Sequence, residues 1–311
     1  MLIKVKKAGE DFQLCDTFIG PIATVNESSW EMIKAVKKHG ADKAVTEIAN
    51  LFEIDKETAK EDIDNVIETL KDIGVKVEDI SLKVSDEEYA PRSVEFVISP
   101  ECNCECIYCQ SSWTRDNKIA LSTEQIKTVL TDLSTIGCWC AWVECGGVLL
   151  RKDIFEIFSH AEEIEMAVVI FISGSTVNDD IAKKLASYKN LRVQVNLDSC
   201  IAKHHDFQRG LPGDFEKSVE GIKTLKKHGI VPQVAMIVTK YNLDDVKATA
   251  DFVHNLGIEY FFLGPTGYFY GRANENKDFL RLNSLEIKKL KDMLVNVQEK
   301  YKDKMIVSLS T

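Results

Sequence analysis

The chain has 311 residues, of which 45% are hydrophobic and 28% are charged, and this balance is typical of a globular protein with a sizeable core. Its length predicts two domains, or one barrel with an appendage. The longest apolar runs, such as residues 166–172, are far too short to span a membrane, and the sequence has no signal-peptide pattern. Nine cysteines without a secretory signal indicate metal binding in a reducing compartment. We therefore expect a cytoplasmic protein with no membrane partner.

The net charge of −10 is concentrated near the N-terminus. Residues 1–90 hold 12 lysines and 20 acidic residues, which accounts for −8 of the total. Binding to phosphate groups requires a basic face. This acidity therefore argues against nucleic acid as a partner.

Three short β-prone runs within residues 2–25 open the chain, and three helical patterns with apolar residues at helical spacing follow them. Three small strands with three helices predict a winged-helix-like α+β domain over residues 1–80. The next stretch, residues 81–92, is rich in Asp, Glu and Ser, and such a composition is typical of a linker.

From residue 93 onward, predicted strands alternate with predicted helices. The six strands are expected at 94–98, 139–144, 167–172, 191–197, 233–238 and 260–263. Repeated βα units imply a parallel sheet with right-handed crossovers. Six units predict an α/β fold, an open and incomplete (β/α)6 barrel over residues 93–311. In such barrels the chemistry lies at the C-terminal ends of the strands.

Three cysteines directly follow the first barrel strand, at Cys102, Cys106 and Cys109. The spacing Cys-x3-Cys-x2-Cys does not fit a closed tetrahedral zinc site, which takes paired cysteines and four ligands. Three thiolates suit a cubane iron–sulfur cluster, whose fourth iron then lacks a protein ligand. The motif, with Tyr108 before the last cysteine, resembles the cluster loop of the radical S-adenosylmethionine (radical SAM) enzymes. Cys104 departs from the family pattern, and we expect its side chain on the opposite side of the loop.

The resemblance implies a [4Fe-4S] cluster and S-adenosylmethionine as cofactors. In the family, the open iron chelates the amino and carboxylate groups of S-adenosylmethionine. One electron then splits the sulfonium into methionine and a 5′-deoxyadenosyl radical, which abstracts a substrate hydrogen. We therefore expect an oxidoreductase that needs an electron donor such as flavodoxin or ferredoxin. The protein's part is to place the reactants and to exclude water and oxygen.

The same resemblance identifies candidate cofactor-binding residues. Tyr108 corresponds to the aromatic residue that the family places beside the adenine. At the end of the second strand, Gly146 and Gly147 allow the backbone to approach the methionine amino group closely. The family usually has Gly-Gly-Glu-Pro at this place. Here Gly147 replaces the Glu, and Glu144 is a candidate to compensate for it.

Later strand ends supply further candidates. Ser173, at the third strand, offers a polar contact to the cofactor, and Asn196, at the fourth, would face the ribose or methionine moiety. The next stretch resembles one in radical SAM peptide maturases, and in it Arg209 is expected to pair with the methionine carboxylate. The alternative for Arg209 is a solvated loop residue. Asp198 is expected to cap the following turn.

Two other segments complete the prediction for the barrel. Residues 264–273 resemble the family's segment that ends in Gly-Arg-Ala, so adenine contacts and the start of the substrate pocket are expected there, with core packing as the alternative for the aromatic residues. Peptide-modifying relatives usually carry auxiliary clusters in a Cys-rich C-terminal extension. Because no cysteine follows Cys200, we expect no auxiliary cluster within this sequence.

The order of elements in residues 1–80 resembles the RiPP recognition element, which binds the leader of ribosomally made peptides, and the related peptide chaperone of pyrroloquinoline quinone biosynthesis. The landmarks are a strand ending at Asn26, then Trp30 and an acidic third helix. The leader is expected to add as an extra strand beside that helix. The contact residues would be Ile22, Ala23, Thr24 and Val25. A winged-helix DNA reader would fit the fold but not the charge.

These features predict a radical SAM maturase that abstracts hydrogen from a ribosomally made precursor peptide. Thioether formation, carbon–carbon crosslinking and epimerisation all begin with that step, and the sequence does not choose among them. One alternative is a radical SAM enzyme that acts on a small-molecule cofactor precursor. The other is a degenerate barrel, kept as a peptide-binding or partner subunit after loss of the Gly-Gly-Glu carboxylate. The sequence identifies no catalytic side chain.

Overall fold

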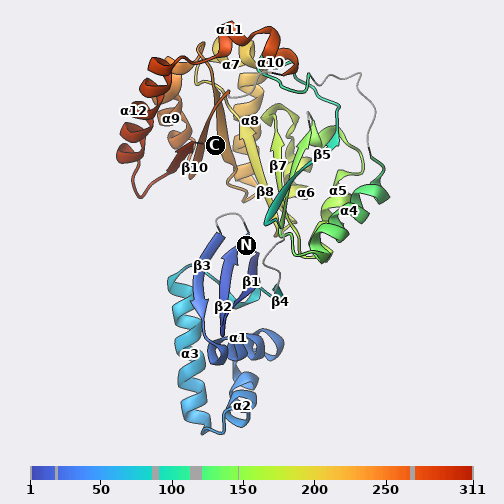
Figure 1. Cartoon of the computed structure of the whole chain (residues 1–311), viewed down its shortest axis with the longest axis vertical. Coiled ribbons are helices and arrows are strands. Elements are labelled where there is room, and N and C mark those ends of the chain that lie inside the picture. Colours follow the sequence, from blue (N-terminus) through green and yellow to red (C-terminus); the bar gives the residue numbers. More distant parts are fainter. Residues whose placement is uncertain are drawn as a thin grey trace. The chain divides into compact units, whose positions relative to one another are not determined.

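The computed structural model describes residues 2–17, 20–85, 91–112, 121–145, 147–266 and 270–309. The chain divides into two compact units (Figure 1). The first contains residues 1–94 together with 130–140 and 162–167, and the second contains the remaining residues.

The N-terminal part is built on a four-stranded sheet in the order β3-β2-β1-β4. Its strands are β1 (Ile3–Ala8), β2 (Asp11–Asp16), β3 (Gly20–Val25) and β4 (Ile80–Ser85). β1 and β3 pair antiparallel with β2, whereas β4 pairs parallel with β1. β3 therefore lies at one edge of the sheet, with β2 as its neighbour on one side.

β4 corrects the prediction that residues 81–92 are only a linker, because most of this strand falls within that range. Apolar Ile80, Leu82 and Val84 alternate with polar residues, which is the strand period. Ile80 is fully buried in the core of this part, and Leu82 and Val84 pack against the same core. The high content of charged and polar residues concealed this alternation.

Three helices follow β3, as the sequence predicts. They are α1 (Glu27–His39), α2 (Ala41–Leu51) and α3 (Lys56–Asp72), and the short η1 (Val77–Asp79) leads into β4. Asn26 and Asp55 cap α1 and α3, since their side chains accept hydrogen bonds from backbone N–H groups of the first turn. Trp30 of α1 is buried and stacks on Phe12 of β2, with 5.3 Å between the ring centroids. This contact joins the helices to the sheet.

The second sheet has seven strands in the order β11-β10-β9-β8-β7-β6-β5. They are β5 (Ser93–Ser99), β6 (Cys140–Cys145), β7 (Ala167–Ile172), β8 (Leu191–Asn196), β9 (Gln233–Val238), β10 (Tyr260–Pro265) and β11 (Ile306–Leu309). The neighbouring strands from β7 to β11 pair parallel. The first six strands confirm the predicted partial α/β barrel, and β11 extends it by one strand.

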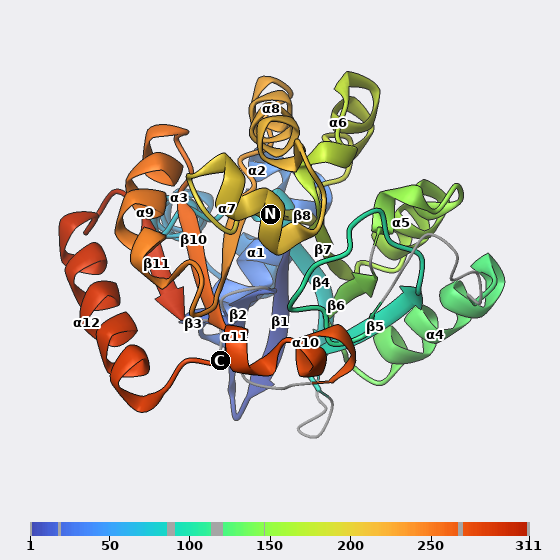
Figure 2. The same ribbon diagram turned by 90° about the horizontal axis from the view of Figure 1, so that it is seen from above.

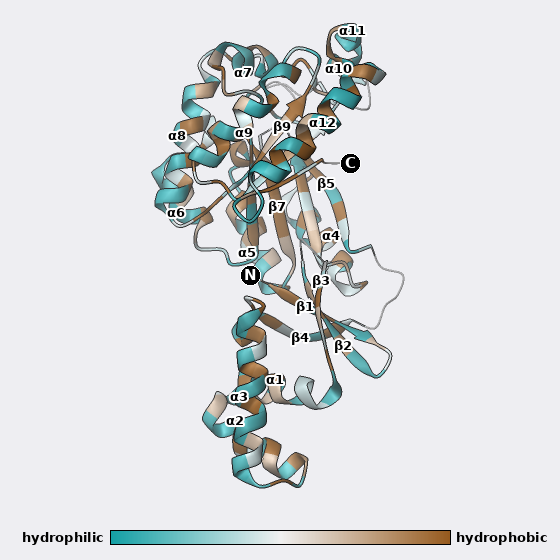
Figure 3. Cartoon of the chain, turned by 90° about the vertical axis from the view of Figure 1, so that its left-hand side faces the viewer, coloured by the Kyte–Doolittle hydropathy of each residue, from teal (hydrophilic) through white to brown (hydrophobic). Residues whose placement is uncertain are grey.

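Helices follow the strands in alternation. The longer ones are α4 (Thr123–Thr135), α5 (Ile154–Glu163), α6 (Asp179–Leu185), α7 (Ala202–Arg209), α8 (Asp214–Lys227), α9 (Val246–Asn255) and α12 (Ser284–Lys300). Short ones are η2 (Val148–Leu150), η3 (Gly174–Thr176), η4 (Leu243–Asp245), α10 (Gly271–Glu275) and α11 (Lys277–Leu280). In Figure 3 the strands are mostly hydrophobic, whereas the helices mix hydrophobic and hydrophilic residues, the pattern of a sheet covered by amphipathic helices. Among the described segments, no helix combines the length and apolar character that crossing a bilayer requires.

Candidate iron–sulfur and cofactor site

The loop that follows β5 brings its cysteines together. Cys102, Cys104 and Cys106 are buried, and half-buried Cys109 packs against them with Tyr108 and Leu211. The structure thus gathers all three predicted cluster cysteines at the C-terminal end of the first barrel strand. A strand's C-terminal end is where a parallel barrel places its chemistry.

Cys104 lies within this cluster, so the expectation that it points to the opposite side of the loop is wrong. Its side chain packs in one buried cluster with those of Cys102 and Cys106, and Arg209 Nη2 donates to its Sγ over 3.4 Å. The Cys104 backbone N–H also donates to Cys102 Sγ over 3.4 Å, because the chain turns tightly here. Cys104 lies in the cluster in contact with the Arg209 guanidinium, which is 105 positions away along the chain. Local sequence does not reveal a contact over this separation.

The end of α7 holds one side of the cysteine loop. The Glu105 N–H donates to the Arg209 carbonyl over 3.1 Å, and the Ile107 N–H donates to the Gln208 carbonyl over 3.0 Å. Gly210 continues from α7 with φ of 60°, and a Cβ atom there would overlap the Glu105 carbonyl. Only glycine combines this left-handed conformation with so close an approach.

The α10–α11 segment holds the other side. The Ala273 N–H donates to the Cys109 carbonyl over 3.0 Å, and Arg272 Nη1 donates to the Cys106 carbonyl over 3.2 Å. Asn276 Nδ2 donates to the Ile107 carbonyl over 3.2 Å. Figure 1 shows α7, α10 and α11 at the same end of the barrel, and Figure 2 shows the loop after β5 running between α7 and α10. The Gly-Arg-Ala segment therefore anchors the cysteine loop, a role that the sequence analysis missed although it singled out the motif.

Arg209 is buried, with 6% of its surface exposed, so it is not a solvated loop residue. Its Nη1 donates to the Tyr108 hydroxyl over 2.8 Å, and its Nε lies 3.5 Å from Asp214 Oδ2. The Tyr108 hydroxyl in turn donates to Asp198 Oδ2 over 2.7 Å. Burial raises the pKa of Tyr108 well above its usual value, so this hydroxyl remains protonated. The guanidinium thereby joins the loop to two buried carboxylates.

Asp214 is the centre of a second group of hydrogen bonds. It accepts from Ser173 Oγ over 2.9 Å and from His205 Nε2 over 3.0 Å. Burial alone would raise the pKa of Asp214, but the hydrogen bond from His205 and the charge of Arg209 outweigh it and hold the pKa well below its usual value. Ser173 is therefore bound to a carboxylate and to Ser175, at 2.8 Å. His205 and Asp214 fall in the stretch that resembles peptide maturases, but the sequence did not predict that they pair.

Asp198 does not cap the following turn. Its Oδ1 accepts from the Ile237 N–H of β9 over 2.9 Å, while its Oδ2 accepts from Tyr108. Its backbone N–H donates to His205 Nδ1 over 3.1 Å, which makes Nδ1 an acceptor and places the ring proton on Nε2, facing Asp214. Burial raises the pKa of Asp198. The residue thus links β8, β9 and the cysteine loop.

The remaining predicted positions lie around this end of the barrel. The Gly147 N–H donates to the Glu101 carbonyl over 2.7 Å, next to the first cysteine, and a Cβ atom at Gly147 would collide with Leu150. Asn196 ends β8 with its side chain half-buried. Glu144 lies on β6 and is half-buried, and burial together with the charge of Glu95 raises its pKa. Gly146 lies outside the described residues, as do 267–269.

The donor set fits an iron–sulfur cluster. Buried thiols are soft ligands of the kind such clusters take. In the described part of the chain, no three His, Cys, Asp or Glu side chains converge on a single metal ion, but a cubane binds one thiolate at each iron, so its ligands need not meet at one point. Buried polar atoms without a hydrogen bond also remain at Arg209 Nε, Asn103 Oδ1 and Thr266 Oγ1. Polar groups of this kind are available to a bound cofactor.

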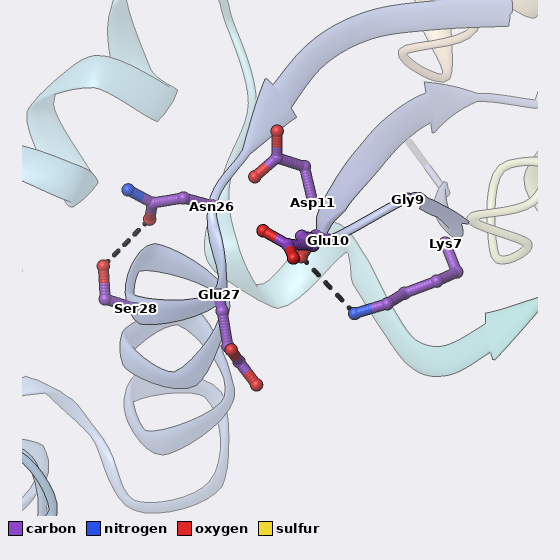
Figure 4. A pocket seen from close by; sticks show the side chains of 7 residues that line it. All are labelled: Lys7, Gly9, Glu10, Asp11, Asn26, Glu27 and Ser28. Atoms are coloured by element: carbon purple, nitrogen blue, oxygen red, sulfur yellow. Dashed lines mark hydrogen bonds between the residues drawn. The ribbon is translucent and has the colours of Figure 1, made fainter.

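A separate pocket of about 590 Å³ occurs in the N-terminal part (Figure 4). Its lining comprises Lys7, Gly9, Glu10, Asp11, Asn26, Glu27 and Ser28. It lies where the β1–β2 turn meets the start of α1, and Asn26 is the cap of that helix. It contains neither cysteine nor histidine, so it offers no ligand of the kind found in the cysteine loop.

Comparison with known proteins identifies the family. Residues 96–253 match the model of the Radical SAM superfamily. The chain belongs to this superfamily, whose members use a [4Fe-4S] cluster and S-adenosylmethionine.

The curated relatives include proteins with different named functions. The AdoMet-dependent heme synthase of Methanosarcina barkeri is 31% identical over 182 residues, which cover 57% of this chain and 52% of the relative. The sporulation killing factor maturation protein SkfB of Bacillus subtilis is 28% identical over 202 residues, which cover 65% of this chain and 49% of SkfB. The chain spans about half the length of the curated relatives it matches.

Among solved structures, Streptococcus suis SuiB has the same fold. With S-adenosylmethionine bound, it aligns with a TM-score of 0.64 at 15% identity, and with its precursor peptide SuiA bound, with a TM-score of 0.65 at 13% identity. Each alignment covers 100% of this chain and 71% of SuiB.

Proposed function

We propose that this protein is a radical SAM maturase that modifies a ribosomally made peptide. The observation that carries the proposal is the cysteine loop, in which Cys102, Cys106 and Cys109 are assigned as the ligands of the [4Fe-4S] cluster. When bound, the cluster and S-adenosylmethionine supply the 5′-deoxyadenosyl radical that abstracts a substrate hydrogen. A low-potential carrier such as flavodoxin or ferredoxin supplies the electron, and the reaction takes place in the cytoplasm.

The chain's own residues hold the loop and line the cofactor position. Gly147 sits against the backbone beside Cys102, which supports its assignment to the methionine amino group together with Gly146. Asn196 and Tyr108 are assigned to the ribose and adenine sides. Arg209 is retained as a partner of the methionine carboxylate, because its Nε makes no hydrogen bond, although it lies 3.5 Å from Asp214 Oδ2. Its two Nη atoms meanwhile fix Tyr108 and Cys104.

The N-terminal part is proposed to bind the peptide leader as an additional strand along β3. β3 is an edge strand, and an edge leaves backbone N–H and C=O groups open to pairing. Ile22, Ala23 and Val25 are half-buried against the same core as Val66 and Ile67 of α3. The exposed parts of these side chains offer an apolar wall beside the edge, and Thr24 faces solvent. Residues 1–80 are thereby assigned as a RiPP recognition element.

Cofactor chemistry is tested after anaerobic reconstitution with iron and sulfide. Addition of dithionite and S-adenosylmethionine should yield 5′-deoxyadenosine, measured by liquid chromatography and mass spectrometry. Product from the wild type and none from Cys106→Ala supports the enzyme. A cluster-loaded wild type that yields no product favours the alternative, a degenerate barrel that serves as a partner subunit.

Peptide binding is tested with labelled peptides encoded by reading frames beside the gene, by fluorescence anisotropy on the full chain. Val66→Glu places a charge in the wall beside β3 and should weaken binding at least tenfold. Asn65→Glu adds the same charge at an exposed neighbouring position of α3 and should leave binding unchanged. Equal binding by all three proteins contradicts the assigned leader site.

The similarity to heme synthases favours a second candidate, a tetrapyrrole precursor as substrate. Such an enzyme needs no leader. If no peptide binds, while a porphyrin precursor increases the yield of 5′-deoxyadenosine, this candidate replaces the peptide maturase.

A further inference from the structure

Three aromatic rings from separate segments of the barrel form one group that is open to solvent. Phe207 of α7 and Tyr241, which follows β9, have ring centroids 4.6 Å apart, and Phe279 of α11 lies 5.8 Å from the first ring and 5.4 Å from the second. Phe207 is 46% exposed and Phe279 is 43% exposed, while Tyr241 is half-buried. We call these three residues the aromatic patch. Contiguous exposed apolar surface of this kind marks an interaction site more often than a single exposed ring does.

The aromatic patch is built on the two segments that hold the cysteine loop. Phe207 directly precedes Gln208, whose carbonyl accepts from the Ile107 N–H over 3.0 Å. The Phe279 N–H donates to the Asn276 carbonyl over 3.0 Å, and Asn276 Nδ2 donates to the Ile107 carbonyl over 3.2 Å. Ile107 directly follows the second assigned cluster ligand. The patch therefore lies beside the loop that is assigned to hold the cluster.

The charge around the aromatic patch is cationic, although the whole chain has a net charge of −10. The patch is carried by residues 203–207, 240–241 and 275–281. In these segments the exposed charged side chains are Lys203, Lys240, Lys277 and Arg281, against Glu275 and Asp278. An excess of cations around an apolar centre favours a partner that is acidic at the matching place, because complementary charge steers encounter and sets orientation.

We propose that the aromatic patch and its basic rim form the docking surface for an acidic one-electron carrier protein. The inference rests on the proposed function, which needs a low-potential carrier to supply an electron to the cluster. The reduced carrier loses one electron to the cluster, and no bond forms or breaks in this step. Redox encounters are weak and use small interfaces, and aromatic residues are enriched at the centre of protein–protein interfaces. An aromatic centre with a charged rim, next to the cysteine loop, meets these requirements.

The first test measures binding of flavodoxin to the full chain by biolayer interferometry. Phe207→Ser removes one ring of the patch, and Lys240→Glu reverses one charge of the rim without removing any ring. Val231→Ser is the control, because this exposed apolar residue precedes β9 and so lies at the opposite end of that strand from the cysteine loop. We expect the Kd for flavodoxin to rise about tenfold in both patch variants and to stay unchanged in Val231→Ser. Added salt should weaken binding more in the wild type than in Lys240→Glu.

The second test compares two ways of delivering the electron. Dithionite is a small reductant that needs no docking surface, whereas reduced flavodoxin must bind first. Formation of 5′-deoxyadenosine is followed with each reductant, at increasing flavodoxin concentrations in the second case. In Phe207→Ser and Lys240→Glu, the rate with dithionite should equal that of the wild type. The half-saturating flavodoxin concentration should rise about tenfold.

Several results would overturn the inference. Unchanged flavodoxin affinity in both patch variants refutes the docking surface. An equal loss of rate with dithionite and with flavodoxin means that the patch supports the fold or the cluster. A wild type that reacts with dithionite but with neither flavodoxin nor ferredoxin excludes a carrier as the occupant, and a dimer that Phe207→Ser dissociates in light scattering assigns the face to a second copy of the chain. A cluster-loaded wild type that gives no product with dithionite contradicts the proposed function instead, and it does so without any change in flavodoxin affinity.

Discussion

Replacing Gly210 by alanine tests whether the end of α7 shapes the cysteine loop. Gly210 has φ of 60°, and a Cβ atom added there would overlap the carbonyl of Glu105, between the first two predicted ligands. Gly213 offers a matched control, because its φ is 76° and a Cβ atom there meets nothing within 4 Å. Both substitutions carry the same left-handed backbone strain. Only Gly210→Ala creates a steric overlap with the cysteine loop.

The difference between the two variants follows from the contacts. The strain shared by both is about 1 kcal/mol. In Gly210→Ala the Glu105 carbonyl must also retreat by about 1 Å to regain an ordinary contact distance. That movement breaks the hydrogen bonds from Glu105 and Ile107 to the α7 carbonyls, at about 1 kcal/mol each. The native loop conformation is thus disfavoured by about 2 kcal/mol more than in the control, roughly a thirtyfold loss in population.

Iron and sulfide analysis after anaerobic reconstitution measures this effect, with far-ultraviolet circular dichroism as the check on folding. We expect Gly210→Ala to keep its helical signal but to load a cluster poorly at limiting iron, while Gly213→Ala loads like the wild type. Equal cluster content in both variants would refute the argument that the α7 contacts determine the shape of the loop.

Three further outcomes are expected. Asp214→Asn leaves Arg209 buried without its carboxylate and should cost about 3–5 kcal/mol in urea unfolding at pH 7. Because the Asp214 pKa is depressed well below its usual value in the folded state, its stabilising contribution is complete above about pH 4 and is lost as the pH falls below that value, so the difference in unfolding free energy between wild type and variant should narrow steadily as the pH is lowered from about 4. Glu144→Gln should weaken S-adenosylmethionine binding about tenfold in anaerobic equilibrium dialysis with unchanged iron, since the loss of one charge-assisted hydrogen bond has that magnitude; unchanged affinity means that Glu144 does not compensate for the missing family carboxylate. Cys106→Ala should lose most of its iron and visible absorbance in metal analysis, whereas Cys138→Ala retains both, and a fully loaded Cys106→Ala contradicts the assigned ligand set.

The strands of the barrel were predictable because their signal is local. Runs such as Ala167–Ile172 are buried almost throughout, and helical patterns with clear ends separate them. β4 was missed because it contains Lys83 and borders an acidic segment. The polar composition of this stretch indicated a linker, although its apolar residues alternate with the two-residue period of a strand. The surroundings of Arg209 were not predictable from sequence. Its partners Tyr108 and Cys104 lie 101 and 105 positions away, and no local pattern distinguishes a buried arginine from a solvated one.

The same long-range contacts hold the backbone of the cysteine loop on two sides. The backbone N–H groups of Glu105 and Ile107 are satisfied by α7, and the carbonyls of Cys106 and Cys109 by residues of α10. In a zinc finger the metal supplies the folding free energy, because few other contacts fix the ligands. Here residues of the fourth and sixth βα units make these contacts. The fold therefore holds the backbone around the proposed ligands through contacts between the protein's own residues.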